Sequence, residues 1–210
     1  MSTPNENQQP RPDTRERILS VAHEAVLAKG FDATSIEEIA AAVDISRAGF
    51  FYHFPDKTAL ALALVERHAR IEDALMSDLM ARARELSDDP LQRLLIMVKL
   101  YAEVYAGGLH GFPGSLVASS AYQDRMFSAK VKEATRRAVL SWRARLKVLL
   151  EEVAAAYPPR EPVDLTALAD FMSTAVEGGS VLGRVLDKPD LIEGQVLLMR
   201  QYLKLLFSPR

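Results

Sequence analysis

The side chains that most often carry enzymatic or metal chemistry are few and widely spaced in this sequence. There is no cysteine, so disulfides, thiolate metal sites and thiol redox chemistry are excluded. The four histidines are scattered, and no two have the i, i+4 spacing that places two metal ligands on one helix face. The acidic pairs Glu37-Glu38 and Glu151-Glu152 lie on predicted helices, where adjacent side chains diverge by about 100°. We therefore predict that the chain is not an enzyme, holds no metal and needs no cofactor.

A second group of side chains combines hydroxyl, cationic and aromatic character in one short stretch. Ser35 precedes an apolar run and is followed three residues later by Glu38, which is the pattern of a capping box. The helix that it opens is predicted to end at Asp44, and Ser46 is predicted to cap another short helix that Pro55 closes. Two short helices around a three-residue turn are typical of a helix-turn-helix, which binds DNA.

The remaining segments also have helical periodicity, and no long stretch alternates as a strand does. We predict an all-α fold of about nine helices, with the longer ones near 13–29, 55–86, 90–107, 124–156, 163–186 and 190–207. The predicted organisation is a disordered Pro-, Asn- and Gln-rich tail (1–11), a three-helix DNA-binding domain (12–58) and a helical domain (59–210). The long helix 55–86 would link the two domains.

Charge and hydropathy are less specific. The net charge is −2, and residues 1–70 contain eight Lys/Arg against ten Asp/Glu, which counts mildly against DNA binding because phosphate neutralisation supplies most non-specific affinity. A helix-turn-helix nevertheless needs only a few cations on one surface. No apolar run approaches the roughly 18 residues of a membrane span, and the N-terminus lacks an apolar signal-peptide core. We expect a cytoplasmic protein with no membrane partner.

The stretch from Gly30 to Leu60 resembles the signature of the TetR family of bacterial regulators. Over about residues 13–65, roughly a quarter of the chain, the glycine, cap, turn, aromatic cluster and Phe-Pro-x-Lys motif occur in order at family spacing. Two positions depart from the pattern, because Asp44 stands where the family usually has glycine and Phe51 where many members have tyrosine. Aspartate tolerates left-handed backbone, so we expect the turn to survive. We expect backbone anchoring to be weaker at Phe51.

The resemblance implies a set of DNA-binding residues: Thr34, Ser35, Arg47, Ala48, Gly49, Tyr52, His53 and Lys57. Arg47 is the predicted base contact, because a guanidinium can bind guanine O6 and N7 together. The hydroxyls at the start of the second helix, the Tyr52-His53 pair and Lys57 are predicted phosphate contacts. Arg11 and Arg15 could reach the backbone or the minor groove, although solvated tail arginines are equally common. The three neighbouring phenylalanines are predicted to be core.

By resemblance, the chain after about residue 65 binds a small molecule and dimerises. The predicted ligand-binding residues are Met97, Tyr101, Tyr105, Phe112, Ser115, Leu116, Tyr122, Trp142 and Phe171, for any one of which core packing is the alternative. The predicted interface is formed by helices 163–186 and 190–207. It is based on small residues in the first helix (Ala167, Ala169, Ala175, Gly178 and Gly179) and apolar ones in the second (Leu191, Val196, Leu198, Tyr202 and Leu205).

The implied function is ligand-responsive regulation of transcription. We predict a repressor that binds a palindromic DNA operator as a homodimer and is released by a small apolar or amphipathic effector. One alternative is a protein of the same fold that binds no small-molecule ligand and acts as a constitutive DNA-binding or activator protein. The other alternative, an enzyme built on helices, would make Arg47 and Lys57 dispensable.

Overall fold

The computed structural model of the chain describes residues 13–106, 116–117, 120 and 127–208, and every regular element in these ranges is an α-helix. The eight helices are α1 (Thr14–Lys29), α2 (Ile36–Val43), α3 (Arg47–His53), α4 (Lys57–Leu86), α5 (Pro90–Val104), α7 (Ala129–Ala156), α8 (Leu165–Val185) and α9 (Leu191–Phe207). The predicted all-helical fold is therefore confirmed. The predicted tail, residues 1–11, lies outside the described residues.

The first three helices are delimited by the predicted capping residues. Ser35 accepts a hydrogen bond from the Glu38 backbone N–H at 3.1 Å, and Ser46 accepts one from the Gly49 N–H at 3.0 Å. Asp44 ends α2 in the left-handed region (φ 58°), and its N–H donates to two carbonyls of the last turn. The turn therefore survives without glycine, as predicted.

Three helix boundaries differ from the predicted ones by two to five residues. α4 begins at Lys57 rather than at 55, because Asp56 caps it by accepting from the Ala59 N–H at 2.7 Å. α5 ends at Val104 instead of continuing to 107. α7 begins at Ala129 instead of 124, because the Ser128 hydroxyl caps its first turn. In each case a capping group or a turn competes with helical propensity.

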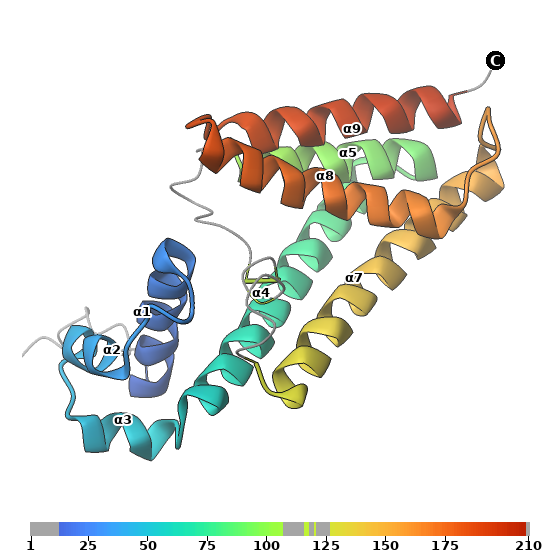
Figure 1. Cartoon of the computed structure of the whole chain (residues 1–210). Helices are drawn as coiled ribbons and strands as arrows, with labels where there is room; N and C mark the ends of the chain where they lie inside the picture. Colours follow the sequence, from blue (N-terminus) through green and yellow to red (C-terminus); the bar gives the residue numbers. More distant parts are fainter. Residues whose placement is uncertain (1–12, 107–115, 118–119, 121–126, 209–210) are drawn as a thin grey trace, which may run out of the picture.

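Helix α4 is part of both hydrophobic cores (Figure 1). Its first turns, from Leu60 to Val65, pack with α1, α2 and α3, and also with Leu116 and with residues at the start of α7. Its last turns, from Met76 to Ala83, pack with α5, α7, α8 and α9. The polar middle of α4 lies between the two cores.

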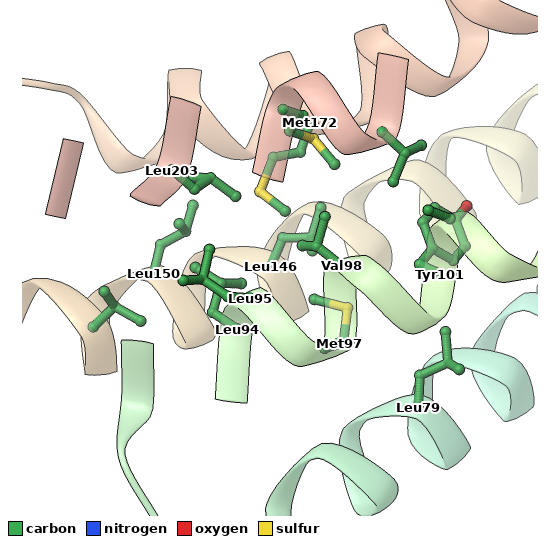
Figure 2. Close-up of a cluster of buried hydrophobic side chains, with 14 of the residues drawn as sticks. Leu79, Leu94, Leu95, Met97, Val98, Tyr101, Leu146, Leu150, Met172 and Leu203 are labelled. Carbon is green, nitrogen blue, oxygen red and sulfur yellow. The ribbon is translucent and has the colours of Figure 1, made fainter. Parts of the chain in front are cut away.

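The second core, which contains Met76 to Ala83 of α4, is built by five helices. In Figure 1, α8 and α9 run side by side over α5, while α4 and α7 cross beneath them. Figure 2 shows Leu94, Leu95 and Val98 of α5 at the centre, between side chains of α4, α7, α8 and α9. None of the helices that the structure describes is both long and apolar enough to cross a membrane.

Candidate functional site

The short helix α3 is held to the protein by its aromatic residues. Phe50 and Phe54 are buried, and their ring centroids lie 5.9 Å apart. Phe51 is half-buried and contacts Phe50 edge-on. A seven-residue helix is marginal by itself, so this packing keeps it folded. The predicted core role of these phenylalanines is confirmed for Phe50 and Phe54.

The opposite face of α3 is open to solvent. Arg47 and Ala48 are exposed, and Tyr52 is 85% exposed, which is unusual for a tyrosine without a partner surface. The Tyr52 and His53 rings meet edge-on with centroids 5.1 Å apart. The Arg47 guanidinium lies 3.2 Å from the Glu37 carboxylate of α2 and within 5.6 Å of the Phe51 ring centroid. The face therefore combines a positioned cation, a phenol and an imidazole.

Lys57, at the start of α4, is fixed by the connection between α1 and α2. Its ammonium donates to the Asp32 carbonyl at 3.3 Å and lies 4.9 Å from the Phe31 ring centroid. These contacts hold the charge near the N-terminus of α4, where the helix dipole adds positive potential. This supporting role of Phe31 and Asp32 was not predicted from the sequence.

One predicted DNA-binding side chain, Thr34, points inward. Thr34 is 1% exposed, and its hydroxyl donates to the Gly30 carbonyl at 2.8 Å. The hydroxyl thereby closes the connection between α1 and α2, and this geometry does not present it to a phosphate. Ser35, the adjacent cap, is exposed. Gly49 is half-buried beside Ser46, where an added Cβ would make only ordinary contacts.

Helix α1 contacts α4 and α8 through polar and aromatic side chains. Arg67 of α4 forms an ion pair with Glu16 and donates to the Ser20 hydroxyl. The rings of His23 and His68 have centroids 6.2 Å apart. At the far end of α1, Arg184 of α8 donates to the Leu27 carbonyl at 3.0 Å. The N-terminal helices are therefore in direct contact with α4 and α8.

A cavity of about 210 Å³ lies beside the polar middle of α4. Its described lining consists of side chains from α4 (His68, Ala69, Glu72 and Asp73), α5 (Tyr101 and Tyr105), α7 (Ala138, Val139, Ser141 and Trp142) and α8 (Ser173, Val176, Glu177 and Ser180), together with Val117. Aromatic and aliphatic walls with a few polar groups are typical of a small-molecule site.

Two titratable groups on one face of α4 have opposite pKa shifts. Burial, together with the nearby carboxylates of Glu177 and Asp73, raises the pKa of Glu72 to about 7. Burial and the adjacent His23 lower the pKa of His68 to about 4. The charge of Asp73 is compensated by Arg145, whose guanidinium lies 3.3 Å away. Among the described residues, no group of three His, Cys, Asp or Glu is arranged to hold a metal ion.

The cavity contains three of the predicted ligand-binding residues, namely Tyr101, Tyr105 and Trp142. Three others are elsewhere. Met97 is buried in the second core, Leu116 packs in the N-terminal core, and Phe171 is 43% exposed with its ring against Tyr202. The remaining predictions, Phe112, Ser115 and Tyr122, lie outside the described residues.

The acidic lining of the cavity was not predicted from the sequence. Its residues look like solvated polar positions on amphipathic helices, and Glu177 stands in the segment that was assigned to dimerisation. A usable signal was the i, i+4 spacing of His68 and Glu72, which places both on one face of α4.

An apolar stripe runs along the outer faces of α8 and α9. It consists of Phe171, Leu182, Val185, Leu198, Tyr202 and Leu205, all at least 43% exposed. The edge-on contact between the Phe171 and Tyr202 rings joins its two halves, with centroids 5.6 Å apart. We refer to this surface as the α8–α9 stripe.

The structure corrects part of the predicted interface. Val196 is fully buried and belongs to the second core of its own chain. Gly179 allows close packing within the chain, because a Cβ there would lie 3.1 Å from the Ile192 Cα of α9. Among the predicted residues of α9, Leu198, Tyr202 and Leu205 do lie on the exposed stripe.

Comparison with known proteins finds similarity to bacterial regulators. The family model described as "Bacterial regulatory proteins, tetR family" matches residues 18–64. The transcriptional regulator TcmR of Streptomyces glaucescens is 32% identical over 104 residues, which are 49% of this chain and 44% of TcmR. The transcriptional activator FasR of Mycolicibacterium smegmatis is 29% identical over 130 residues, 61% of this chain and 57% of FasR. The chain thus spans about half the length of these relatives.

Similarity to solved structures extends over nearly the whole chain. A TetR regulatory protein from Rhodobacter sphaeroides superposes with a TM-score of 0.76 at 22% identity, covering 90% of this chain and 98% of that one. The reduced form of NemR from Escherichia coli superposes with a TM-score of 0.74 at 18% identity, covering 94% and 100%. At these identities the likeness concerns the fold.

Proposed function

Because the chain belongs to the TetR family of helix-turn-helix transcriptional regulators, we propose that it is a homodimeric repressor that binds a palindromic operator and is released by a small effector. It is accordingly a DNA-binding regulator and not an enzyme. The observation that carries the proposal is the open face of α3, where Arg47, Ala48 and Tyr52 are exposed on a helix that is otherwise anchored by Phe50 and Phe54.

The proposed contacts follow from the position of each group. Arg47 would read a base edge, while Ser35, Tyr52, His53 and Lys57 would bind phosphates. Ala48 and Gly49, early in α3, would lie close to the bases. Thr34 is left out of this set because its hydroxyl is buried.

Dimerisation is proposed because one seven-residue recognition helix reads only a few base pairs. A two-fold pair would read two half-sites about 34–36 Å apart, or a multiple of that distance. The surface that fits a second copy of the chain is the α8–α9 stripe, since exposed apolar residues rarely cluster on a monomer without a partner.

Effector release is proposed to act through α4. A short connection that contains Phe54 and Pro55 joins the end of α3 to the start of α4. Farther along α4, His68 and Glu72 line the cavity, and His68 also contacts α1. A ligand that displaces the middle of α4 would change the separation of the two recognition helices. Release requires that the ligand bind the DNA-incompetent state more tightly.

A constitutive regulator without a ligand is the alternative, and the cavity argues against it. A second open point is the direction of regulation, because the relatives include both an activator, FasR, and a repressor, NemR. We favour repression with release. The protein would act in the cytoplasm, where its DNA lies.

The first test is binding of the purified protein to the DNA upstream of its own gene, measured by mobility shift at several salt concentrations. We expect Arg47→Ala to cost about 1–3 kcal/mol per half-site and to relax base preference, whereas Lys57→Ala should weaken binding to all sequences and reduce the salt slope by about one. Arg82→Ala, an exposed arginine farther along α4, is the matched control. If genome-wide selection recovered no bound DNA, or if both variants bound as the wild type does, the proposal would be wrong.

Substitution of Glu37 provides a test in which DNA binding should become tighter and not weaker. The Glu37 carboxylate lies 3.2 Å from the Arg47 guanidinium, and a bound DNA would have to compete with it for that cation. We expect Glu37→Gln to tighten operator binding about three- to tenfold at low salt, because one negative charge per recognition helix is removed beside the DNA. Glu85→Gln, an exposed carboxylate at the end of α4, should change nothing. Unchanged or weaker binding by Glu37→Gln would argue against Arg47 as a contact.

A further inference from the structure

The cavity beside α4 has an acidic and aromatic lining. Glu72 and Asp73 come from α4 and Glu177 from α8, and no lysine or arginine is found among the lining residues that the structure describes. The charge of Asp73 is balanced by Arg145. The Glu72 carboxylate has no hydrogen bond or ion pair within the described part of the chain.

The remaining walls suit a positive charge as well. Tyr101 and Tyr105 meet edge-on, with ring centroids 5.2 Å apart and hydroxyls 2.9 Å apart, and the Trp142 ring centroid lies 6.0 Å from that of Tyr101. The faces of such rings attract cations, most strongly when the site is shielded from water. Tyr101 and Tyr105 are buried, and their pKa values are raised by burial, so both phenols stay neutral.

We propose that the cavity binds a small lipophilic organic cation, an amine or quaternary ammonium compound, between the carboxylates of Glu72 and Glu177 and the aromatic rings of Tyr101, Tyr105 and Trp142. The half-buried Glu72 carboxylate has no cationic partner in the described part of the chain, which makes its charge unfavourable, and a cation that enters removes this penalty. A neutral ligand of the same shape leaves the penalty in place, and an anion adds to it. This inference names the effector class of the proposed regulator and so rests on that function.

Binding of a cation in the cavity is coupled to release of a proton from the Glu72 carboxyl. The charged and titratable groups around this carboxyl are His68 and Asp73 on α4, Glu177 on α8, Tyr101 and Tyr105 on α5, and Arg145 on α7 beside Asp73. Since the pKa of Glu72 is raised to about 7, half of the empty sites carry a proton there at neutral pH. A bound cation expels this proton, so cation affinity should rise about tenfold between pH 6 and pH 8.

The test uses two probes of the same shape and different charge, benzyltrimethylammonium and neopentylbenzene, with the full chain and without DNA. Trp142 is the only tryptophan, so its fluorescence reports events in the cavity, and calorimetry provides a second readout. We expect the cation to bind at least about tenfold more tightly than its neutral counterpart at pH 8. Glu72→Gln and Glu177→Gln should each remove most of that preference, and Glu72→Gln should also remove the pH dependence.

Glu85→Gln changes the same charge on the same helix outside the cavity and should keep the preference for the cation. The inference is overturned if neopentylbenzene binds as tightly as the cation, if neither probe binds, or if the glutamine variants keep the preference. The probe comparison in the wild type decides the point even if a variant does not fold. Since no DNA is present, failure here leaves the regulator proposal standing, and failure of operator binding leaves the cation result intact.

Discussion

A chain carrying Leu182→Asp and Leu205→Asp is expected to be a folded monomer whose operator affinity is lower by at least about 100-fold. Both side chains lie on the α8–α9 stripe, and at least half of each is exposed, so the monomer tolerates the change. In a two-fold dimer the two substitutions place four carboxylates in an apolar interface, where each unpaired charge costs several kcal/mol. Sedimentation or light scattering measures the mass, and mobility shift measures the binding.

A matched pair outside the stripe controls for the added charge. Leu86→Asp at the end of α4 and Val148→Asp on α7 also replace exposed apolar residues, and we expect this double variant to remain dimeric. The dimer model fails if the wild type is a monomer at micromolar concentration, or if the stripe variant keeps its mass. A monomeric variant with full operator affinity would instead contradict the two-half-site model.

Glu72 and His68 are each expected to make the free energy of unfolding depend on pH, and the two effects should nearly cancel. The pKa of Glu72 is raised from 4.5 to about 7, so its stabilising effect is fully present below pH 4.5 and is lost as the pH rises to about 7. The pKa of His68 is lowered from 6.5 to about 4, so its effect is present above pH 6.5 and is lost as the pH falls to about 4. Each shift corresponds to about 3 kcal/mol of stability, and the two act in opposite directions. The free energy of unfolding of the wild type should therefore change little between pH 4.5 and 6.5.

Single variants separate the two contributions in urea denaturation at fixed protein concentration. Glu72→Gln should be more stable than the wild type at pH 7 by up to about 3 kcal/mol and should lose stability steeply below pH 6.5. His68→Gln should instead lose stability as the pH rises from 4.5 to 7, although His23, whose pKa is lowered by burial and by Arg67, keeps some acid sensitivity. Glu85→Gln should follow the wild type. Parallel pH profiles for the wild type and both cavity variants would show that neither group titrates as described.

The N-terminal part of the fold could be predicted from the sequence because its determinants are local. Ser35, Asp44 and Ser46 each fix a helix end through hydrogen bonds to backbone groups at most four residues away. The caps and the left-handed turn are therefore found at the positions predicted from the sequence. The inward orientation of Thr34 could not be predicted in this way. Its hydroxyl bonds to Gly30, and the neighbouring cap, Ser35, has nearly the same side chain but points to solvent.

The cavity could be predicted only in part, because its lining depends on how four helices are rotated about their axes. Tyr101, Tyr105 and Trp142 are aromatic residues of the middle helices that were predicted to bind a ligand, and all three line the cavity. Met97 has the same kind of sequence environment as Tyr101 but faces the core, and Phe171 faces outward. Periodicity identifies the apolar side of a helix and does not say which part of that side meets a void.

The continuous course of α4 through both cores limits how this protein can be divided or recombined. A fragment that ended at residue 56 would lack the turns from Leu60 to Val65, which complete the N-terminal core, and would be expected to remain unfolded. Exchange of sensor halves between such regulators would therefore need its junction inside the helix, between Val65 and Met76. That junction runs through His68 and Glu72, so a chimera would inherit the operator preference of one parent and a mixed ligand pocket from both.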